Sequence, residues 1–101
     1  MLTSKQRAQL RGMANGIDTI LIVGKDGVTA NVSAQASDAL KARELVKGRV
    51  LENSLLTARE ACGILCERCK AEPVQVIGSK FVLYKRNETD PKIELVKSKK
   101  K

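Results

Sequence analysis

The chain has 101 residues, of which 43% are apolar and 30% are charged, as in a single soluble globular domain. Nineteen Lys and Arg oppose eleven Asp and Glu, and the net charge of +8 favours a polyanionic partner such as RNA, DNA or an anionic membrane. His and Trp are absent and Phe and Tyr occur once each, which argues against histidine-based catalysis and against a nucleic-acid surface built from stacked rings.

The first helix and the first strand have clear patterns. Residues 2–13 place their apolar side chains on one helical face, and Thr3 with Gln6 is the spacing of a capping box. Residues 19–23 are a short, continuous apolar run rich in β-branched side chains, which predicts a buried strand.

A loop, a second helix and a second strand follow. Residues 24–27 read Gly-Lys-Asp-Gly and predict a loop. Either Thr29 or Asn31 can cap the helix after it, whose apolar residues repeat at helical spacing as far as about residue 43. Residues 45–51 are short and rich in Val, which favours a strand.

The last part of the domain predicts a helix and a hairpin. Apolar positions recur at helical spacing from about residue 56 to residue 70, and Pro73 cannot continue that helix. Residues 74–77 and 80–85 predict two strands, joined by a turn at Gly78-Ser79.

The predicted fold is therefore α/β, a single compact domain of order α-β-α-β-α-β-β. We expect a mixed four-stranded sheet with helices packed on it, and parallel pairing where a helix joins two strands. Residues 1–86 are expected to form this domain, and residues 87–101 a basic, disordered tail in which Ile93, Leu95 and Val96 are able to dock.

The loop Gly24-Lys25-Asp26-Gly27 is the strongest candidate for a binding site. Glycines let a backbone approach a phosphate closely, and the following helix offers free N–H groups and the positive end of its dipole. Lys25 would neutralise the bound charge. The alternative is a tight turn that needs glycine for its conformation alone. The sequence contains neither a Walker A motif nor a dinucleotide-binding GxGxxG motif.

The three cysteines, Cys62, Cys66 and Cys69, have the spacing of an iron–sulfur motif, but they also repeat at helical spacing among other apolar residues. Because neither a fourth Cys nor any His is available, we interpret them as core residues and predict no metal and no cofactor. The odd number of cysteines and the lack of an export signal predict reduced thiols and a cytoplasmic protein. The sequence also predicts no membrane association.

Four parts of the sequence carry a resemblance: residues 6–11, residues 22–29, residues 39–40 with 43–47, and residues 74–78 with 81–84. Together they resemble the CRM domain, the chloroplast splicing and ribosome maturation domain, in its stand-alone bacterial form, the YhbY-like proteins. The resemblance implies a fold similar to the C-terminal domain of initiation factor three, RNA binding, and association with precursors of the large ribosomal subunit. The family's GxxG loop corresponds to residues 24–27, and the basic residues of its first helix to Arg7 and Arg11.

We therefore predict a non-enzymatic, monomeric RNA-binding protein that assists large-subunit assembly by binding 23S rRNA in pre-50S particles. The candidate RNA-binding residues are Gly24, Lys25, Asp26, Gly27, Thr29, Lys5, Arg7, Arg11, Lys47, Arg49 and Lys80. We interpret Arg59, Arg68 and Lys70 as a solvated face shared with nearby acids. The main alternative is an adaptor that docks on ribosomal or other proteins through a sheet edge or the tail, without contacting RNA. DNA binding and catalysis are weaker alternatives.

Overall fold

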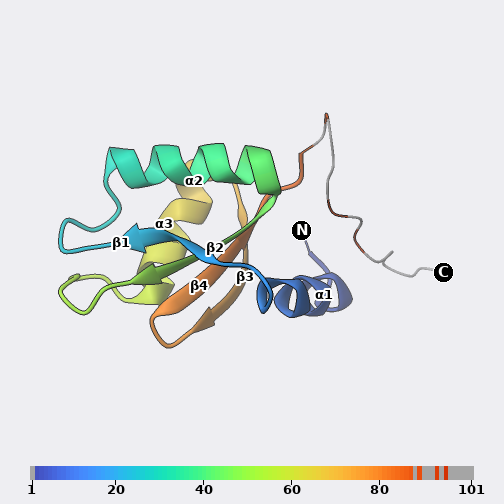
Figure 1. Ribbon diagram of the computed structural model, residues 1–101, viewed down its shortest axis with the longest axis horizontal. Coiled ribbons are helices and arrows are strands. Elements are labelled where there is room, and N and C mark those ends of the chain that lie inside the picture. The colour runs from blue at the N-terminus through green and yellow to red at the C-terminus, as the bar shows by residue number, and fades with distance from the viewer. Residues whose placement is uncertain (1, 88, 90–92, 94, 96–101) are drawn as a thin grey trace.

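A computed structural model describes residues 2–87, 89, 93 and 95, and this part of the chain forms three helices and one four-stranded sheet (Figure 1). The elements are α1 (Ser4–Ala14), β1 (Thr19–Val23), α2 (Ala30–Arg43), β2 (Leu45–Val50), α3 (Ala58–Cys69), β3 (Glu72–Ile77) and β4 (Lys80–Tyr84). The predicted fold class and element order are confirmed, and the ends of the elements differ from the predicted ones by about two residues.

The strands lie in the order β1-β2-β4-β3. β1 pairs with β2 in parallel, as predicted, and β4 pairs antiparallel with both β2 and β3. β2 and β3, which α3 joins, are therefore not neighbours, because β4 lies between them. β4 is buried along most of its length and takes a central position, whereas β3 contains Pro73 and lies at the edge, where the missing N–H is tolerated.

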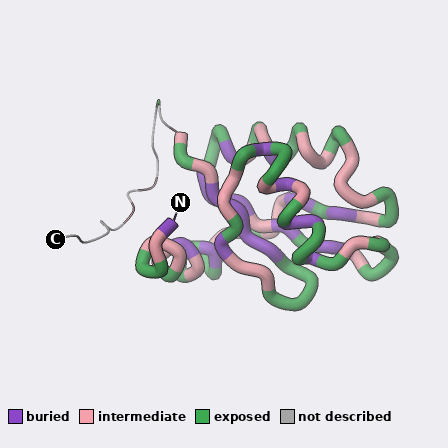
Figure 2. Tube along the Cα trace, turned by 180° about the vertical axis from the view of Figure 1, so that it is seen from behind, coloured by how far each residue is buried: buried purple, intermediate pink, exposed green. Residues whose placement is uncertain are grey.

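α2 and α3 cover one face of the sheet and enclose the larger core cluster (Figures 1 and 2). Gly48 of β2 lies under the ring of Phe81 there, and a Cβ at this position would come within 2.5 Å of the ring. A side chain is therefore excluded from residue 48. α1 packs on the opposite face, over a second cluster that includes Leu10, Leu45 and Tyr84.

Helix starts follow the local sequence. α1 and α3 both begin with a complete capping box: Thr3 with Gln6, and Thr57 with Glu60. Thr29, rather than Asn31, caps α2. None of the helices in the described part of the chain has the length and hydropathy needed to cross a membrane.

Contacts with the domain extend beyond residue 86. Asn87 and Ile93 donate their backbone N–H groups to the carboxylate of Glu44, at 2.6 Å and 2.7 Å. Ile93 and Leu95 pack against the second core cluster. Val96, the third residue expected to dock, lies outside the described residues. The boundary at residue 86 and the disorder of the tail stay predictions.

Candidate nucleic-acid interface

The loop Gly24–Gly27 connects the end of β1 to α2 through a tight turn. The N–H of Gly27 donates to the carbonyl of Gly24 at 3.0 Å, and the N–H of Thr29 donates to the carbonyl of Gly27 at 3.1 Å. Gly27 has φ +74°, a conformation that strains any residue with a Cβ. Lys25 and Asp26 occupy the exposed tip of the turn. The turn therefore holds the Lys25 cation out toward solvent.

The two glycines lie against the loop between β2 and α3. A Cβ on Gly27 would come within 3.3 Å of Cδ1 of Leu56, and one on Gly24 within 3.9 Å of Cδ1 of Leu51. Gly27 is thus required both for its backbone conformation and for this close approach. The two loops form one continuous end of the molecule (Figure 1).

Side chains also fix the segment that leads from the loop into α2. The hydroxyl oxygen of Thr29 accepts the N–H of Val32 at 3.2 Å, which caps the helix. Arg68 of α3 donates to the carbonyl of Val28 at 2.9 Å and to the hydroxyl of Ser33 at 3.1 Å. The interpretation of Arg68 as merely solvated missed this role. Its partners are 35 and 40 residues away in sequence, and no local pattern indicates them.

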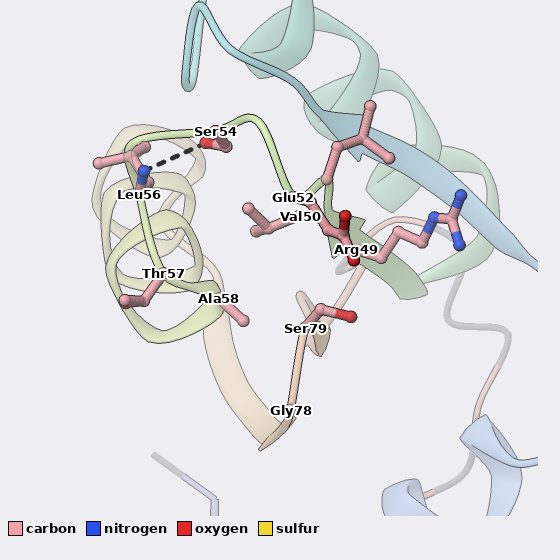
Figure 3. Close-up of a pocket in the computed structure, with 10 residues that line it drawn as sticks. Arg49, Val50, Glu52, Ser54, Leu56, Thr57, Ala58, Gly78 and Ser79 are labelled. Atoms are coloured by element: carbon pink, nitrogen blue, oxygen red, sulfur yellow. Dashed lines mark hydrogen bonds between the residues drawn. The ribbon is translucent and has the colours of Figure 1, made fainter.

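A hollow of about 630 Å³ opens beside these loops, between the β2–α3 connection and the Gly78–Ser79 turn (Figure 3). The N–H of Val50 donates to the carbonyl of Ser79 at 2.7 Å and ties the two sides together. Arg49 and Glu52 both line the hollow, so its walls carry both signs of charge. The Arg49 side chain extends away from α3 (Figure 3).

The structure brings two of the predicted basic residues to the same end of the sheet as Lys25. Arg49, near the end of β2, and Lys80, at the start of β4, are partners in the antiparallel register and both are exposed. Side chains of directly paired residues point to the same face of a sheet, so the two cations are neighbours. Lys25, Arg49 and Lys80 thus gather at the loop end.

The remaining predicted basic residues do not join them. Lys5, Arg7 and Arg11 belong to α1, which lies at the opposite end of the sheet from the Gly24–Gly27 loop (Figure 1). Lys47 is half-buried, and its ammonium group donates to the carbonyl of Ala14, near the end of α1, at 3.2 Å. This bond fixes α1 to β2.

The cysteines line the inner side of α3. Cys62 and Cys69 are buried and Cys66 is half-buried, and the thiol of Cys69 donates to the carbonyl of Ser33 at 3.6 Å. A hydrogen bond between the Cys62 and Cys66 thiols lowers the pKa of Cys62 and raises that of Cys66. Within the described ranges, no cluster of three or more Cys, Asp and Glu side chains is arranged to hold a metal ion.

Residues 2–85 match the model of the CRS1/YhbY (CRM) domain family. The chain is 40% identical over 95 residues to the probable RNA-binding protein YqeI of Bacillus subtilis. This alignment covers 94% of this chain and 99% of YqeI. It is 33% identical over 94 residues to an RNA-binding protein of Haemophilus influenzae, with 93% and 94% covered. The solution structure of the hypothetical protein SAV1595 from Staphylococcus aureus is similar, with a TM-score of 0.79, 42% identity, and 95% and 100% of the two chains covered.

Proposed function

Because the chain belongs to the CRS1/YhbY (CRM) domain family, we propose that it is a non-enzymatic RNA-binding protein whose RNA site is the loop end of the sheet. The observation that carries this proposal is the Gly24–Gly27 turn, which holds Lys25 exposed beside the paired cations Arg49 and Lys80. Two relatives named as RNA-binding proteins, each matching more than nine-tenths of the chain, support the same partner.

Binding at this loop depends on the close approach of a phosphate to the backbone. The glycines keep the loop free of bulky side chains, and the turn presents the ammonium group of Lys25 to a phosphate oxygen. The α2 N-terminus directly after the loop adds the positive end of a helix dipole, and its first turn carries no acidic residue that would oppose a phosphate. Arg68 and Thr29 keep this arrangement in place.

The RNA that we propose is 23S rRNA in precursors of the large ribosomal subunit, and the function is assistance in assembling that subunit in the cytoplasm, as a monomer. The net charge of +8 on 101 residues fits a protein that must stay on a densely charged particle. The only aromatic residues, Phe81 and Tyr84, are both buried, which favours recognition of backbone and shape over stacking on exposed rings.

The direct test compares Lys25→Ala with Lys41→Ala by fluorescence anisotropy on rRNA fragments at several salt concentrations. Lys41 is also exposed, but it lies in the last turn of α2, far from the loop, so both variants lose the same charge. We expect Lys25→Ala to weaken binding about three- to tenfold and to reduce the salt slope by about 0.7–0.9, and Lys41→Ala to do much less. Equal effects of the two variants would contradict a site at the loop.

The ribosomal part of the proposal is tested by sedimenting a cell lysate on sucrose gradients at low and high salt. Migration with large-subunit precursors at low salt, lost at high salt, is the expected result, because phosphate contacts are weakened by salt. Presence only at the top of both gradients would argue against the ribosomal role. Partners that survive RNase treatment in a pull-down would instead favour the adaptor alternative.

A further inference from the structure

The sheet face that carries α1 is left uncovered at its loop end, because α1 lies at the opposite end of the sheet (Figure 1). Four residues in one row of the register lie there, one from each strand: Ile22 pairs with Arg49, Arg49 with Lys80, and Lys80 with Ile77. We call these four residues the open row. All four are exposed, Ile22 to 42% and Ile77 to 61%. Their neighbours along the same face toward α1 are less exposed: Lys47 is half-buried, and Val82 is buried in the second cluster.

The composition of the open row is unusual for a solvated surface. Two aliphatic side chains flank two cations, and adjacent strands are about 4.8 Å apart, so the row crosses roughly 14 Å from Ile22 to Ile77. A polyanion with apolar groups beside its charges matches this order. An extended nucleic-acid strand has that composition, because each nucleotide combines a charged phosphate with the apolar face of a base.

The open row is continuous with the loop. Ile22 is separated from Gly24 by the buried residue Val23 alone, and Arg49 lies one strand further along. A strand whose phosphate is held at the Gly24–Gly27 loop would therefore reach Arg49 and Lys80 by crossing the sheet edge at β1. α1 leaves this path free because it lies at the opposite end of the sheet (Figure 1).

We propose that the open row binds an unpaired segment of RNA, with phosphates on Arg49 and Lys80 and bases against Ile22 and Ile77. This inference rests on the proposed RNA-binding function and specifies its substrate class. The isoleucines favour single-stranded RNA, because the faces of bases in a duplex are stacked on one another and cannot contact a protein side chain. The Arg49 guanidinium can also lie flat on a base, a contact that needs no aromatic residue.

The experiment measures the affinity of the full-length protein for a fluorescent 12-nucleotide single strand and for a duplex of the same sequence. The decisive variant is Ile22→Thr/Ile77→Thr, which keeps the β-branched shape and the net charge. Met13→Gln is the matched control, because Met13 is 41% exposed and belongs to α1, which lies at the opposite end of the sheet from the loops (Figure 1). Circular dichroism verifies that each variant is folded.

We expect the wild type to prefer the single strand at least about tenfold, and the double isoleucine variant to weaken single-strand binding about fivefold with an unchanged salt slope. Met13→Gln should have no effect. Arg49→Gln/Lys80→Gln should lower the salt slope for the single strand by about 1.4, which corresponds to two phosphate contacts.

Equal affinity for both RNAs, or equal effects of the isoleucine and Met13 variants, would overturn the open row as a binding surface. If Lys25→Ala still weakened binding in that case, the RNA site at the loop would stand without the open row. If the wild-type protein bound neither RNA, both proposals would fail.

Discussion

The two ends of the sheet differ in whether their charged side chains are buried or exposed. At the end near α1, Glu44 is fully buried, and its carboxylate accepts the N–H groups of Asn87 and Ile93. At the loop end, Lys25, Arg49 and Lys80 are exposed next to exposed aliphatic side chains. One end uses its charge to hold the chain together, whereas the other presents charge to solvent. Stability and binding are therefore expected to separate along the sheet.

The largest effect is expected from Glu44→Ala. The substitution removes two charge-assisted hydrogen bonds and leaves two partly buried N–H groups without their acceptor, so we expect the free energy of unfolding to fall by about 3 kcal/mol. Glu44 also has φ +66°, which glycine tolerates without strain. Glu44→Gly should therefore be about 1 kcal/mol more stable than Glu44→Ala.

Urea unfolding measures the free energy of unfolding of both variants, and their RNA affinity is measured under conditions in which they are folded. We expect the affinity to stay close to that of the wild type, because Glu44 follows the last turn of α2, whereas the loop precedes the first turn of that helix. A loss of affinity as large as that of Lys25→Ala would break the separation between the two ends. A loss of stability below 1 kcal/mol would show that Glu44 does not hold the C-terminal segment.

A comparison of individual residues in the sequence and in the structure shows which features the sequence can predict. Thr3 and Gln6 lie three residues apart, and the capping box that their spacing predicts is present with both hydrogen bonds. The strand at residues 19–23 was likewise predicted from a local run. Several short segments together resemble the CRM domain, and the match of residues 2–85 to the family model confirms the family. Local patterns define elements because the interactions that form them are local.

Glu44 and Arg68 could not be assigned in this way. The partners of the Glu44 carboxylate are 43 and 49 residues away, and those of Arg68 are 35 and 40 residues away. Such contacts exist only after the sheet has formed. The basic residues illustrate the same limit, because Lys47 and Arg49 alternate on one strand face but only Arg49 is exposed. The candidate RNA-binding residues themselves stay a prediction.

An intermediate effect is expected at the loop end from Arg68→Gln. Loss of the bonds to Val28 and Ser33 should lower the free energy of unfolding by about 1 kcal/mol, since both bonds are exposed to solvent. RNA affinity should fall about threefold, because the segment between the loop and α2 is then less well fixed. Arg59→Gln, on the same helix and also exposed, is the control for the lost charge. Identical affinities of the two variants would mean that Arg68 does not position the loop.

The smallest effect concerns Tyr84, at the Glu44 end. Its side chain is buried, and its hydroxyl has no hydrogen-bond partner in the part of the chain that the structure describes. Burial, followed by the nearby Glu44 charge, raises the pKa of Tyr84. Tyr84→Phe removes a buried polar atom without a partner, so at pH 7 we expect it to be neutral or to stabilise the protein by up to about 1 kcal/mol.

The pH dependence of the stability of the wild type and of Tyr84→Phe also tests the burial of Tyr84, and its expected sign is definite. Because the pKa of Tyr84 is higher in the folded than in the unfolded chain, the folded state retains its proton longer. The stability of the wild type therefore begins to fall as the pH rises past about 10, the pKa of an unperturbed tyrosine, and this fall continues up to the folded pKa. We would measure the free energy of unfolding of the wild type and of Tyr84→Phe by urea unfolding between about pH 8 and 11. The difference between the two proteins at each pH isolates the contribution of Tyr84 from that of the lysines. A difference that stays constant over this range would show that Tyr84 ionises as readily in the folded as in the unfolded protein, and that the Glu44 end is less closed than its burial indicates.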